Sequence, residues 1–502
     1  MTRIVFWSVT SLKIIIGVFK MRSETKLILS TIAVLFFVAS FPAQVIDGAK
    51  AAEQRAREVA EHLLTGNRAE YRKYIEGNFN DEMKKMPMER HLSFFSALYD
   101  SSRGYELLGV HESKANEVTM LAKNKLTGDV DGLLVQVDRN SPFKIAGLGM
   151  RRVPMSAGSG KLSNQEIAKQ LDSFLTKLAE ADVFSGSVLL AKDGRVIYKG
   201  AFGSANKDFG VPNRIDTKFN LGSMNKMFTA VAIAQLVERG KLSYDDPLSK
   251  FVPDFPNAEA ARKIQIKHLL SHTAGLGGYF SPRYSSMSRA KLRNLDDMMA
   301  LAVADEKDIQ FEPGSKWQYS NTGMMVLGKV IEIVSGQSYY DFVRANIHQP
   351  AGMINTDCYE LDKVNTNLAV GYEKEYTDNG IRWSNNIFEH VMRGGPQGGG
   401  YSTVEDLLRF DQALRSGKLI SAESFKLLTS PKPELNSPRY GYGFFAAVDG
   451  GPTGHSGGFT GISSNLSMFL GSGWTAVVMS NYGRAAQPIS QKMNNLISAS
   501  SN

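Results

Sequence analysis

The chain has 502 residues, 43% of them hydrophobic and 22% charged, a composition typical of a globular protein and not of a disordered or fibrous one. This length favours two or three domains. The formal net charge of +8 is modest, and no Lys/Arg run with interleaved aromatic residues concentrates it, so no nucleic-acid partner is expected. The single cysteine, Cys358, excludes an internal disulfide and a metal site built from several thiolates.

The N-terminal region has the pattern of an export signal. Met21 is followed by the basic residues Arg22 and Lys26, by the apolar run LILSTIAVLFFVASF, and by a segment of small residues. The apolar run is shorter than the ~20 residues that cross a bilayer as a helix. We therefore expect translation to begin at Met21, residues 1–49 to be a signal peptide or anchor region, and the protein to be periplasmic or secreted. An uncleaved membrane anchor stays open, because no good cleavage site is present.

A small α+β domain is predicted over residues 50–153. The segment AAEQRAREVAEHLLTG is an amphipathic helix ending at Gly66, and further helical sequence runs to about Tyr99. Short β-rich runs parted by turn residues follow from Gly104 onward, which predicts an antiparallel meander after the helices. The ending SPFKIAGLGM (141–150) loosely resembles the cone-shaped family of nuclear transport factor two and scytalone dehydratase. No catalytic set accompanies this resemblance, and we interpret the domain as a binding or positioning module.

The composition of residues 154–164 indicates a linker, and a second domain is predicted over 165–502. The GSGK sequence inside the linker lacks both the first Gly and the Ser or Thr of a phosphate-binding loop. The second domain opens with a helix and a hairpin around Asp193-Gly194, and near its end a hairpin about Gly471–Gly473 precedes a helical tail. A sheet built from both ends of this domain, with a long helical region between them, is therefore expected.

The motif Ser-x-x-Lys recurs along the chain, and its context selects one occurrence. Ser23 belongs to the export signal, Ser204 lies in a turn, and Ser288 lies in a polar, basic stretch. Ser223 alone is followed by MFTAVAIAQLVERG, which predicts a buried helix. The helix N-terminus would favour a developing alkoxide on Ser223, and Lys226, one turn on, can hold its proton. Taken by itself, Ser223 would more often be an N-cap than a nucleophile.

Two further motifs accompany Ser223 and Lys226. The segment FEPGSKWQYSNTGMMVLGKVIEI (311–333) places Tyr319 and Asn321 at the start of another apolar helix, and GPTGHSGGFTG (451–461) places His455 and two glycines at the last hairpin. Ser-x-x-Lys, Tyr-x-Asn and His/Lys-x-Gly, in this order, are the three elements of penicillin-recognising serine hydrolases.

Residues from about 165 to 495 resemble the β-lactamase-related serine hydrolase family, which contains class C β-lactamases, D-Ala-D-Ala carboxypeptidases, D-aminopeptidases and esterases. The supporting sequences are HLLSHTAGL (268–276), QPAGM (349–353), GGGYSTVEDLLRF (398–410) and YGYGF (440–444). The resemblance implies an α/β (α+β) penicillin-recognising serine hydrolase fold and covers about two thirds of the chain. It also implies an enzyme without a cofactor.

Roles for individual residues follow from the resemblance together with their chemistry. Ser223 attacks the carbonyl, and Lys226 and Tyr319 share the proton transfers, with the phenol pKa of Tyr319 expected to be lowered by a nearby cation. Asn321 positions Lys226 and the substrate. The backbone N–H groups of Ser223 and Gly458 form the oxyanion hole. The glycines at 457 and 458 let the strand approach the substrate closely.

His455 departs from the β-lactamase pattern, in which Lys is usual and supplies a positive charge for the substrate carboxylate. A neutral imidazole supplies little charge at pH 7, which favours peptidase or esterase relatives. His268 and His272 have the spacing of a helical metal pair, but the intervening residues lack the Glu of a zinc protease, and no metal is expected. The loop RGGPQGGGYST (393–403) is expected beside the active-site cleft.

The sequence thus predicts an exported serine hydrolase that cleaves an amide or ester through a Ser223 acyl-enzyme. A peptidase acting on D-amino-acid peptides and an esterase both stay open. The substrate is expected to be a small molecule or a peptide, with peptidoglycan as one source. The alternatives are a true class C-like β-lactamase and a catalytically idle peptidoglycan-binding protein. The presence of all four residues Ser223, Lys226, Tyr319 and Asn321 argues against an idle protein.

Overall fold

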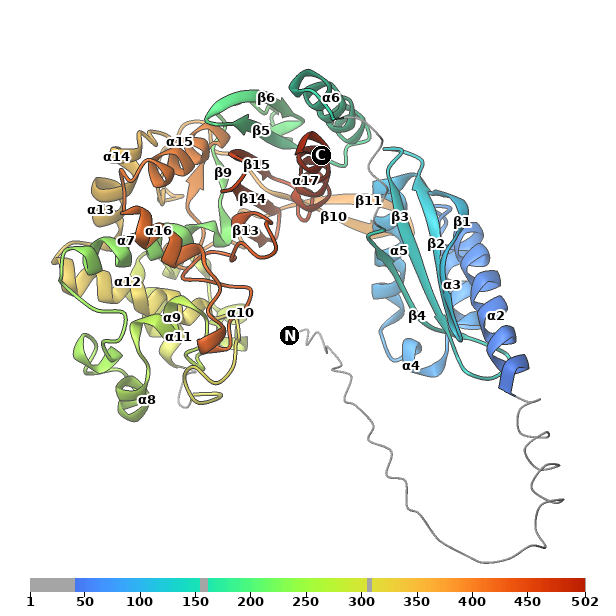
Figure 1. The fold of residues 1–502 in the computed structure, drawn as a ribbon, viewed down its shortest axis with the longest axis horizontal. Helices are drawn as coiled ribbons and strands as arrows, with labels where there is room; N and C mark the ends of the chain where they lie inside the picture. The colour runs from blue at the N-terminus through green and yellow to red at the C-terminus, as the bar shows by residue number, and fades with distance from the viewer. Residues whose placement is uncertain (1–40, 154–160, 305–308, 502) are drawn as a thin grey trace, which may run out of the picture.

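A computed structural model describes residues 41–153, 161–304 and 309–501, arranged as two lobes (Figure 1). The expected export signal lies, up to residue 40, outside these described residues, as does most of the expected linker. Helix α2 begins at Phe41, inside the region assigned to the signal or anchor. Within the described ranges, no helix is both long and apolar enough to cross a membrane.

The N-terminal lobe contains helices followed by a four-stranded antiparallel meander in the order β1-β2-β3-β4. Its helices are α2 (Phe41–His62), α3 (Arg68–Asn78), α4 (Asp81–Lys84) and α5 (Met88–Ser102). Its strands are β1 (Tyr105–Lys114), β2 (Glu117–Asn124), β3 (Val130–Val137) and β4 (Ile145–Arg151). Alternate strand residues such as Val118, Met120 and Val135 are buried beneath Ala56 and Val59 of α2, which gives this lobe a hydrophobic core of its own.

The C-terminal lobe is built on a five-stranded antiparallel sheet in the order β13-β14-β15-β5-β6, with strands from both ends of the lobe. These strands are β5 (Gly186–Lys192), β6 (Arg195–Phe202), β13 (Thr453–Phe459), β14 (Ile462–Phe469) and β15 (Trp474–Ser480). Helices α6 (Asn164–Glu180) and α17 (Ala486–Ser501) cover one face. Helices of the central region cover the other, so the predicted fold class is confirmed.

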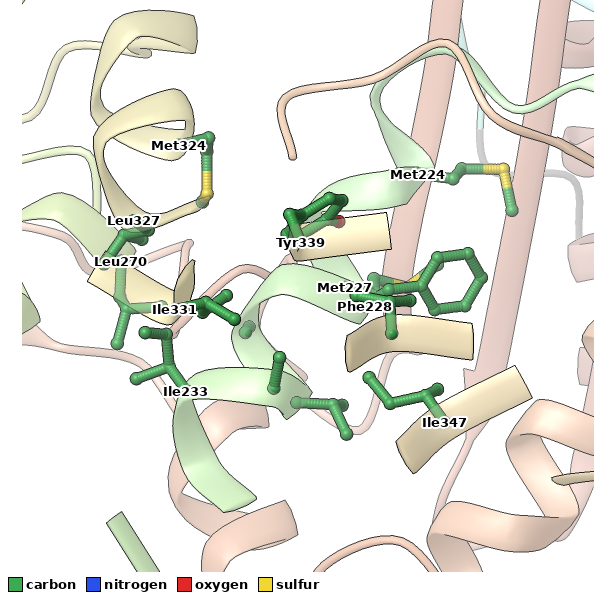
Figure 2. Packing of buried hydrophobic residues seen from close by; sticks show 14 of the residues in the cluster. Met224, Met227, Phe228, Ile233, Leu270, Met324, Leu327, Ile331, Tyr339 and Ile347 are labelled. Atoms are coloured by element: carbon green, nitrogen blue, oxygen red, sulfur yellow. The ribbon is translucent and has the colours of Figure 1, made fainter. Parts of the chain in front are cut away.

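The central region is mostly helical, and Figure 2 shows its core, where Met227 and Phe228 lie among buried residues such as Met324 and Ile331. Its longer helices are α7 (Asn225–Glu238), α11 (Leu295–Ala304), α12 (Asn321–Ser335), α15 (Val404–Arg415) and α16 (Ala422–Thr429). Its shorter helices and turns are η1 (Gly222–Met224), η2 (Leu248–Lys250), α8 (Ala258–Lys263), α9 (Ile266–Leu270), α10 (Pro282–Ser286), η3 (Arg289–Lys291), α13 (Tyr339–Val343), η4 (Arg344–His348), α14 (Gln349–Ala351) and η5 (Pro433–Leu435). Its short strands are β7 (Ser204–Asn206), β8 (Val211–Pro212), β9 (Phe219–Asn220), β10 (Tyr372–Thr377), β11 (Gly380–Asn385) and β12 (Tyr401–Ser402).

The hairpin of β10 and β11 reaches out of the C-terminal lobe to α5 of the N-terminal lobe (Figure 1). Lys374 of β10 forms an ion pair with the buried Asp100 of α5. Beside the hairpin, Arg103 donates a hydrogen bond to the carbonyl of Ala181 at 2.9 Å, and Lys492 forms an ion pair with Asp129 at 2.7 Å. The two lobes are therefore joined by specific polar contacts as well as by the chain.

Candidate active site

Ser223 lies in the turn η1, between the short strand β9 and the long buried helix α7. The preceding Gly222 has a φ of +51°, and a Cβ there would lie 2.8 Å from the amide nitrogen of Gly458. Only glycine allows this approach at that backbone angle. The turn therefore brings the nucleophile beside strand β13.

Lys226 is fully buried one helical turn after Ser223. Its Nζ donates hydrogen bonds to Oδ1 of Asn321, at 2.8 Å, and to the carbonyl of Gln397, and lies 4.8 Å from the ring centre of Tyr319. Burial lowers the pKa of Lys226 well below its usual value. Burial thus favours the neutral amine of Lys226, the form that can accept a proton.

Tyr319 precedes α12 and its hydroxyl interacts with the side chain of Ser223. The expectation of a lowered phenol pKa was wrong: burial raises the pKa of Tyr319, and its interaction with Ser223 offsets this only in part. The cause is desolvation, which disfavours the charged phenolate. Lys226 does little to offset this, because burial drives it toward its own neutral form. Tyr319 is therefore a protonated phenol that can act as a proton donor.

The two predicted glycines lie on β13, next to the nucleophile. A Cβ at Gly457 would come within 1.9 Å of the carbonyl oxygen of Leu221, so no larger residue fits there. Gly458 and Ser223 both line the cavity described below, so the two residues expected to form the oxyanion hole lie at the same space. An oxyanion hole formed by their N–H groups stays a prediction.

His455 is placed differently from the other predicted residues. Its ring is 2% exposed and does not line the cavity. Its Nε2 lies 2.9 Å from the hydroxyl of Tyr440 and its Nδ1 lies 2.6 Å from the carbonyl of Ser456. The carbonyl can only accept, so Nδ1 carries the proton and Nε2 accepts from Tyr440. Burial lowers the pKa of His455 to about 3, and the imidazole offers no positive charge to a substrate.

Acidification is expected to destabilise the protein through His455. Its pKa is about 3 in the folded chain and 6.5 ordinarily, so the unfolded chain binds more protons between these values and stability falls as pH drops through that window. Between pH 7 and pH 5 the loss from His455 is about 2 kcal/mol. The free energy of unfolding, measured by chemical denaturation at both pH values, should fall less in His455→Gln than in the original protein, by about 2 kcal/mol. An identical loss in both proteins would contradict the buried neutral imidazole.

His272 is a residue whose position the sequence did not reveal. Its Nδ1 accepts a hydrogen bond from the N–H of Ser320 at 3.2 Å, and its carbonyl accepts one from Gln318 at 2.9 Å. Its ring lies 4.3 Å from that of Tyr319, centre to centre. His272 thus holds both neighbours of Tyr319.

Across the part of the chain that the structure describes, no group of three or more His, Cys, Asp or Glu residues could hold a metal ion.

A cavity of about 210 Å³ opens at Ser223. Aromatic and aliphatic side chains form much of its wall, namely Tyr279, Phe280, Tyr284, Val391, Phe459 and Ile462. The predicted cleft loop contributes Gln397, Gly398 and Gly399. None of the described residues that line the cavity is Lys or Arg, whereas Glu389 is among them. The aromatic residues were missed because they come from a loop (Tyr279 and Phe280), from the short helix α10 and from the end of β13, where no periodic pattern marks a wall.

Comparison with known proteins places this site in a family. The Beta-lactamase family model matches residues 171–493. A penicillin-binding protein of Bacillus subtilis (strain 168) is 32% identical over 331 residues, which cover 63% of this chain and 72% of that protein. Esterase EstB of Burkholderia gladioli is 29% identical, over 57% of this chain and 81% of the esterase. The crystal structure of a penicillin-binding protein from Bacillus halodurans matches with a TM-score of 0.57 and 30% identity, covering 64% of this chain and 99% of that one. The chain belongs to the Beta-lactamase family and is a serine hydrolase.

Proposed function

We propose that the protein is an exported hydrolase that cleaves esters or amides with an apolar acyl group and no free carboxylate near the scissile bond. Export is proposed from the basic and apolar pattern that follows Met21. The chemistry is proposed from the contacts of Ser223, Lys226 and Tyr319. The class of substrate is proposed from the cavity, whose observed lining carries aromatic groups and no cation.

The proposed reaction begins with neutral Lys226, which takes the proton of the Ser223 hydroxyl as Oγ attacks the substrate carbonyl. The N–H groups of Ser223 and Gly458 stabilise the oxyanion. As the tetrahedral intermediate collapses, the bond to the leaving group breaks. Tyr319 donates its proton to that oxygen or nitrogen and regains one from the Lys226 ammonium. Water then attacks the acyl-enzyme by the same proton transfers in reverse, releasing the acid and restoring Ser223.

The absence of a cation among the described lining residues carries the choice of substrate. A carboxylate that enters a partly buried site without a charged partner loses its hydration, and no ion pair compensates for that loss. Hydrogen bonds to charged groups contribute about 1.5–3 kcal/mol, so a substrate that needs such a partner binds about 10–100-fold more weakly without it. This disfavours the β-lactamase alternative and a carboxypeptidase acting on a free C-terminal carboxylate.

A second candidate, hydrolysis of D-aminoacyl amides or esters, is favoured by one observation. Glu389 lines the cavity, and the faces of nearby tyrosine and phenylalanine rings suit a protonated amine. Such a substrate also has its charge on the acyl side and no carboxylate, so it satisfies the same constraint.

The proposal is tested by comparing kcat/KM for a neutral substrate, nitrophenyl phenylacetate, with that for two carboxylate-bearing substrates, a cephalosporin chromogen and a D-alanyl-D-alanine peptide. We expect the neutral ester to be preferred by at least about tenfold over either carboxylate, from the missing ion pair. D-Phenylalanine amide, compared with its N-acetyl derivative, tests the second candidate. Efficient turnover of the cephalosporin and none of the ester would contradict the proposal.

A further inference from the structure

The hairpin β10–β11 links the N-terminal lobe to the wall of the active-site cavity. We propose that the N-terminal lobe is a positioning module: it holds this hairpin, and the hairpin in turn fixes two segments of the cavity, residues 387–391 and the turn between β13 and β14. This proposal rests on the proposed function only in that the cavity at Ser223 is taken as the site of reaction.

The hairpin needs an external support. Among the described strands, β10 and β11 pair only with each other as a sheet, apart from a single bridge at Tyr372. A two-stranded hairpin is at best marginally stable in water. At the base of the hairpin, Tyr372 and Trp383 pack on the core of the C-terminal lobe. The contacts of β10 with α5 of the N-terminal lobe support its outer part (Figure 1).

Polar contacts at two places hold the hairpin to the N-terminal lobe. Midway along β10, the side chain of Asp100 accepts hydrogen bonds from Nζ of Lys374 and, at 3.2 Å, from the hydroxyl of Tyr376. The side chains of Lys374 and Asp100 are only 12% and 8% exposed, so this ion pair is little screened. At the tip, Asp378 accepts a hydrogen bond from Arg68 at 2.8 Å.

The base of the hairpin is tied to the turn of the oxyanion strand. Asn386, which is 2% exposed, donates from Nδ2 to the carbonyl of Thr460 at 2.7 Å. Glu373 accepts a hydrogen bond from the N–H of Gly461 at 2.8 Å. Gly461 has a φ of +65°, and a Cβ there would lie 2.6 Å from the carbonyl carbon of Gly371. The hairpin base and the β13–β14 turn are therefore packed backbone against backbone.

Both tied segments lead directly into the cavity. Glu389, His390 and Val391 follow Asn386 within five residues and line it. On the other side, Phe459 and Ile462 flank the Thr460–Gly461 turn and line it too. The rings of His390 and Phe459 lie 6.0 Å apart, so the two segments also meet each other. A displacement of the hairpin would move both segments.

The test uses the full-length double variant Lys374→Met/Asp378→Ala, which loosens the hairpin and leaves the N-terminal lobe unchanged. Asp100 keeps its 2.9 Å ion pair with Arg103, and Arg68 keeps its 2.6 Å ion pair with Glu89, so no buried charge is left without a partner. The matched control is Glu53→Ala, which removes the exposed pair of Glu53 with Arg57 on α2. Amide hydrogen exchange is followed in 387–391, in 459–462 and in α12.

We expect exchange in 387–391 and 459–462 to rise by about tenfold in the double variant, with α12 and the control unchanged, as in local and not global opening. We also expect the double variant to raise KM more for a bulky aromatic ester than for nitrophenyl acetate, relative to the original protein. Covalent labelling of Ser223 should be retained. Unchanged exchange in both segments, or a uniform rise that includes α12, would overturn the proposal. The exchange result does not depend on the substrate, so it tests the positioning role independently of the proposed function.

Discussion

Replacement of Ser223 by alanine is expected to abolish covalent labelling by a fluorophosphonate and to lower turnover of an ester by about 10⁶-fold, the cost of removing a serine nucleophile. Lys226, Tyr319 and Asn321 remain in place but have no hydroxyl to activate. The substitution removes one oxygen from a half-buried side chain at the cavity, so the free energy of unfolding should change by about 1 kcal/mol or less.

Ser204→Ala is the matched control, because Ser204 belongs to another Ser-x-x-Lys pair. The expectation that Ser204 lies in a turn was wrong, since it begins the short strand β7, which pairs with β8. Its backbone carbonyl, which accepts hydrogen bonds from Ser185 and Asn481, is unaffected by the substitution. This variant should label and turn over normally. Labelling that persists in Ser223→Ala and disappears in Ser204→Ala would show that the wrong pair had been chosen.

The sequence allowed the fold to be predicted where local patterns carry it. Asp193-Gly194 occupies the β5–β6 turn, and the apolar stretch after Ser223 forms the buried helix α7. The sheet was expected from both ends of the second domain because strand and hairpin patterns occur at those ends. Such patterns depend only on residues close together in the sequence, so they can be recognised without any knowledge of tertiary contacts.

The candidate site could be assembled from sequence only in part. The structure brings Ser223, Lys226, Tyr319 and Asn321 together, and these residues lie in motifs with a fixed order. The pKa of Tyr319 was misjudged because desolvation depends on the packing of the whole lobe around the ring, which no local pattern reports. The position of His455 behind Tyr440 was hidden for the same reason.

The contact between the lobes lay beyond the reach of the sequence. Asp100 and Lys374 are far apart in the chain, and each looks like an ordinary surface charge on a helix or strand. Their burial follows from the contact between two lobes that each have a core of their own, and this contact depends on the shapes and exposed groups of both lobes. The cavity wall is similar, since Tyr279, Phe280 and Phe459 come from loops and a strand end that only the tertiary fold unites.

Tyr319→Phe is expected to lower kcat by roughly 10²–10⁴-fold, the usual cost of removing a general acid–base group. The substitution keeps the ring that packs on His272 and on Lys226, and removes only the hydroxyl. Because burial raises the pKa of this phenol, its contribution at neutral pH is that of a proton donor to the leaving group. The loss should therefore be larger for an amide, whose leaving nitrogen must be protonated, than for a nitrophenyl ester, whose leaving oxygen is already a weak base.

Tyr440→Phe separates this effect from the loss of a buried hydroxyl in general. Tyr440 lies against the same His272, 4.6 Å between ring centres, but its hydroxyl bonds to His455 and does not line the cavity. Its removal should reduce stability by about 1–3 kcal/mol, because Nε2 of His455 loses its partner, and should leave kcat within a few-fold of the original. If Tyr319→Phe had an unchanged rate on both amide and ester, Lys226 would be the sole acid and base. An equal loss in the two variants would instead mean that the aromatic cluster around His272 acts through packing, and that neither hydroxyl transfers a proton.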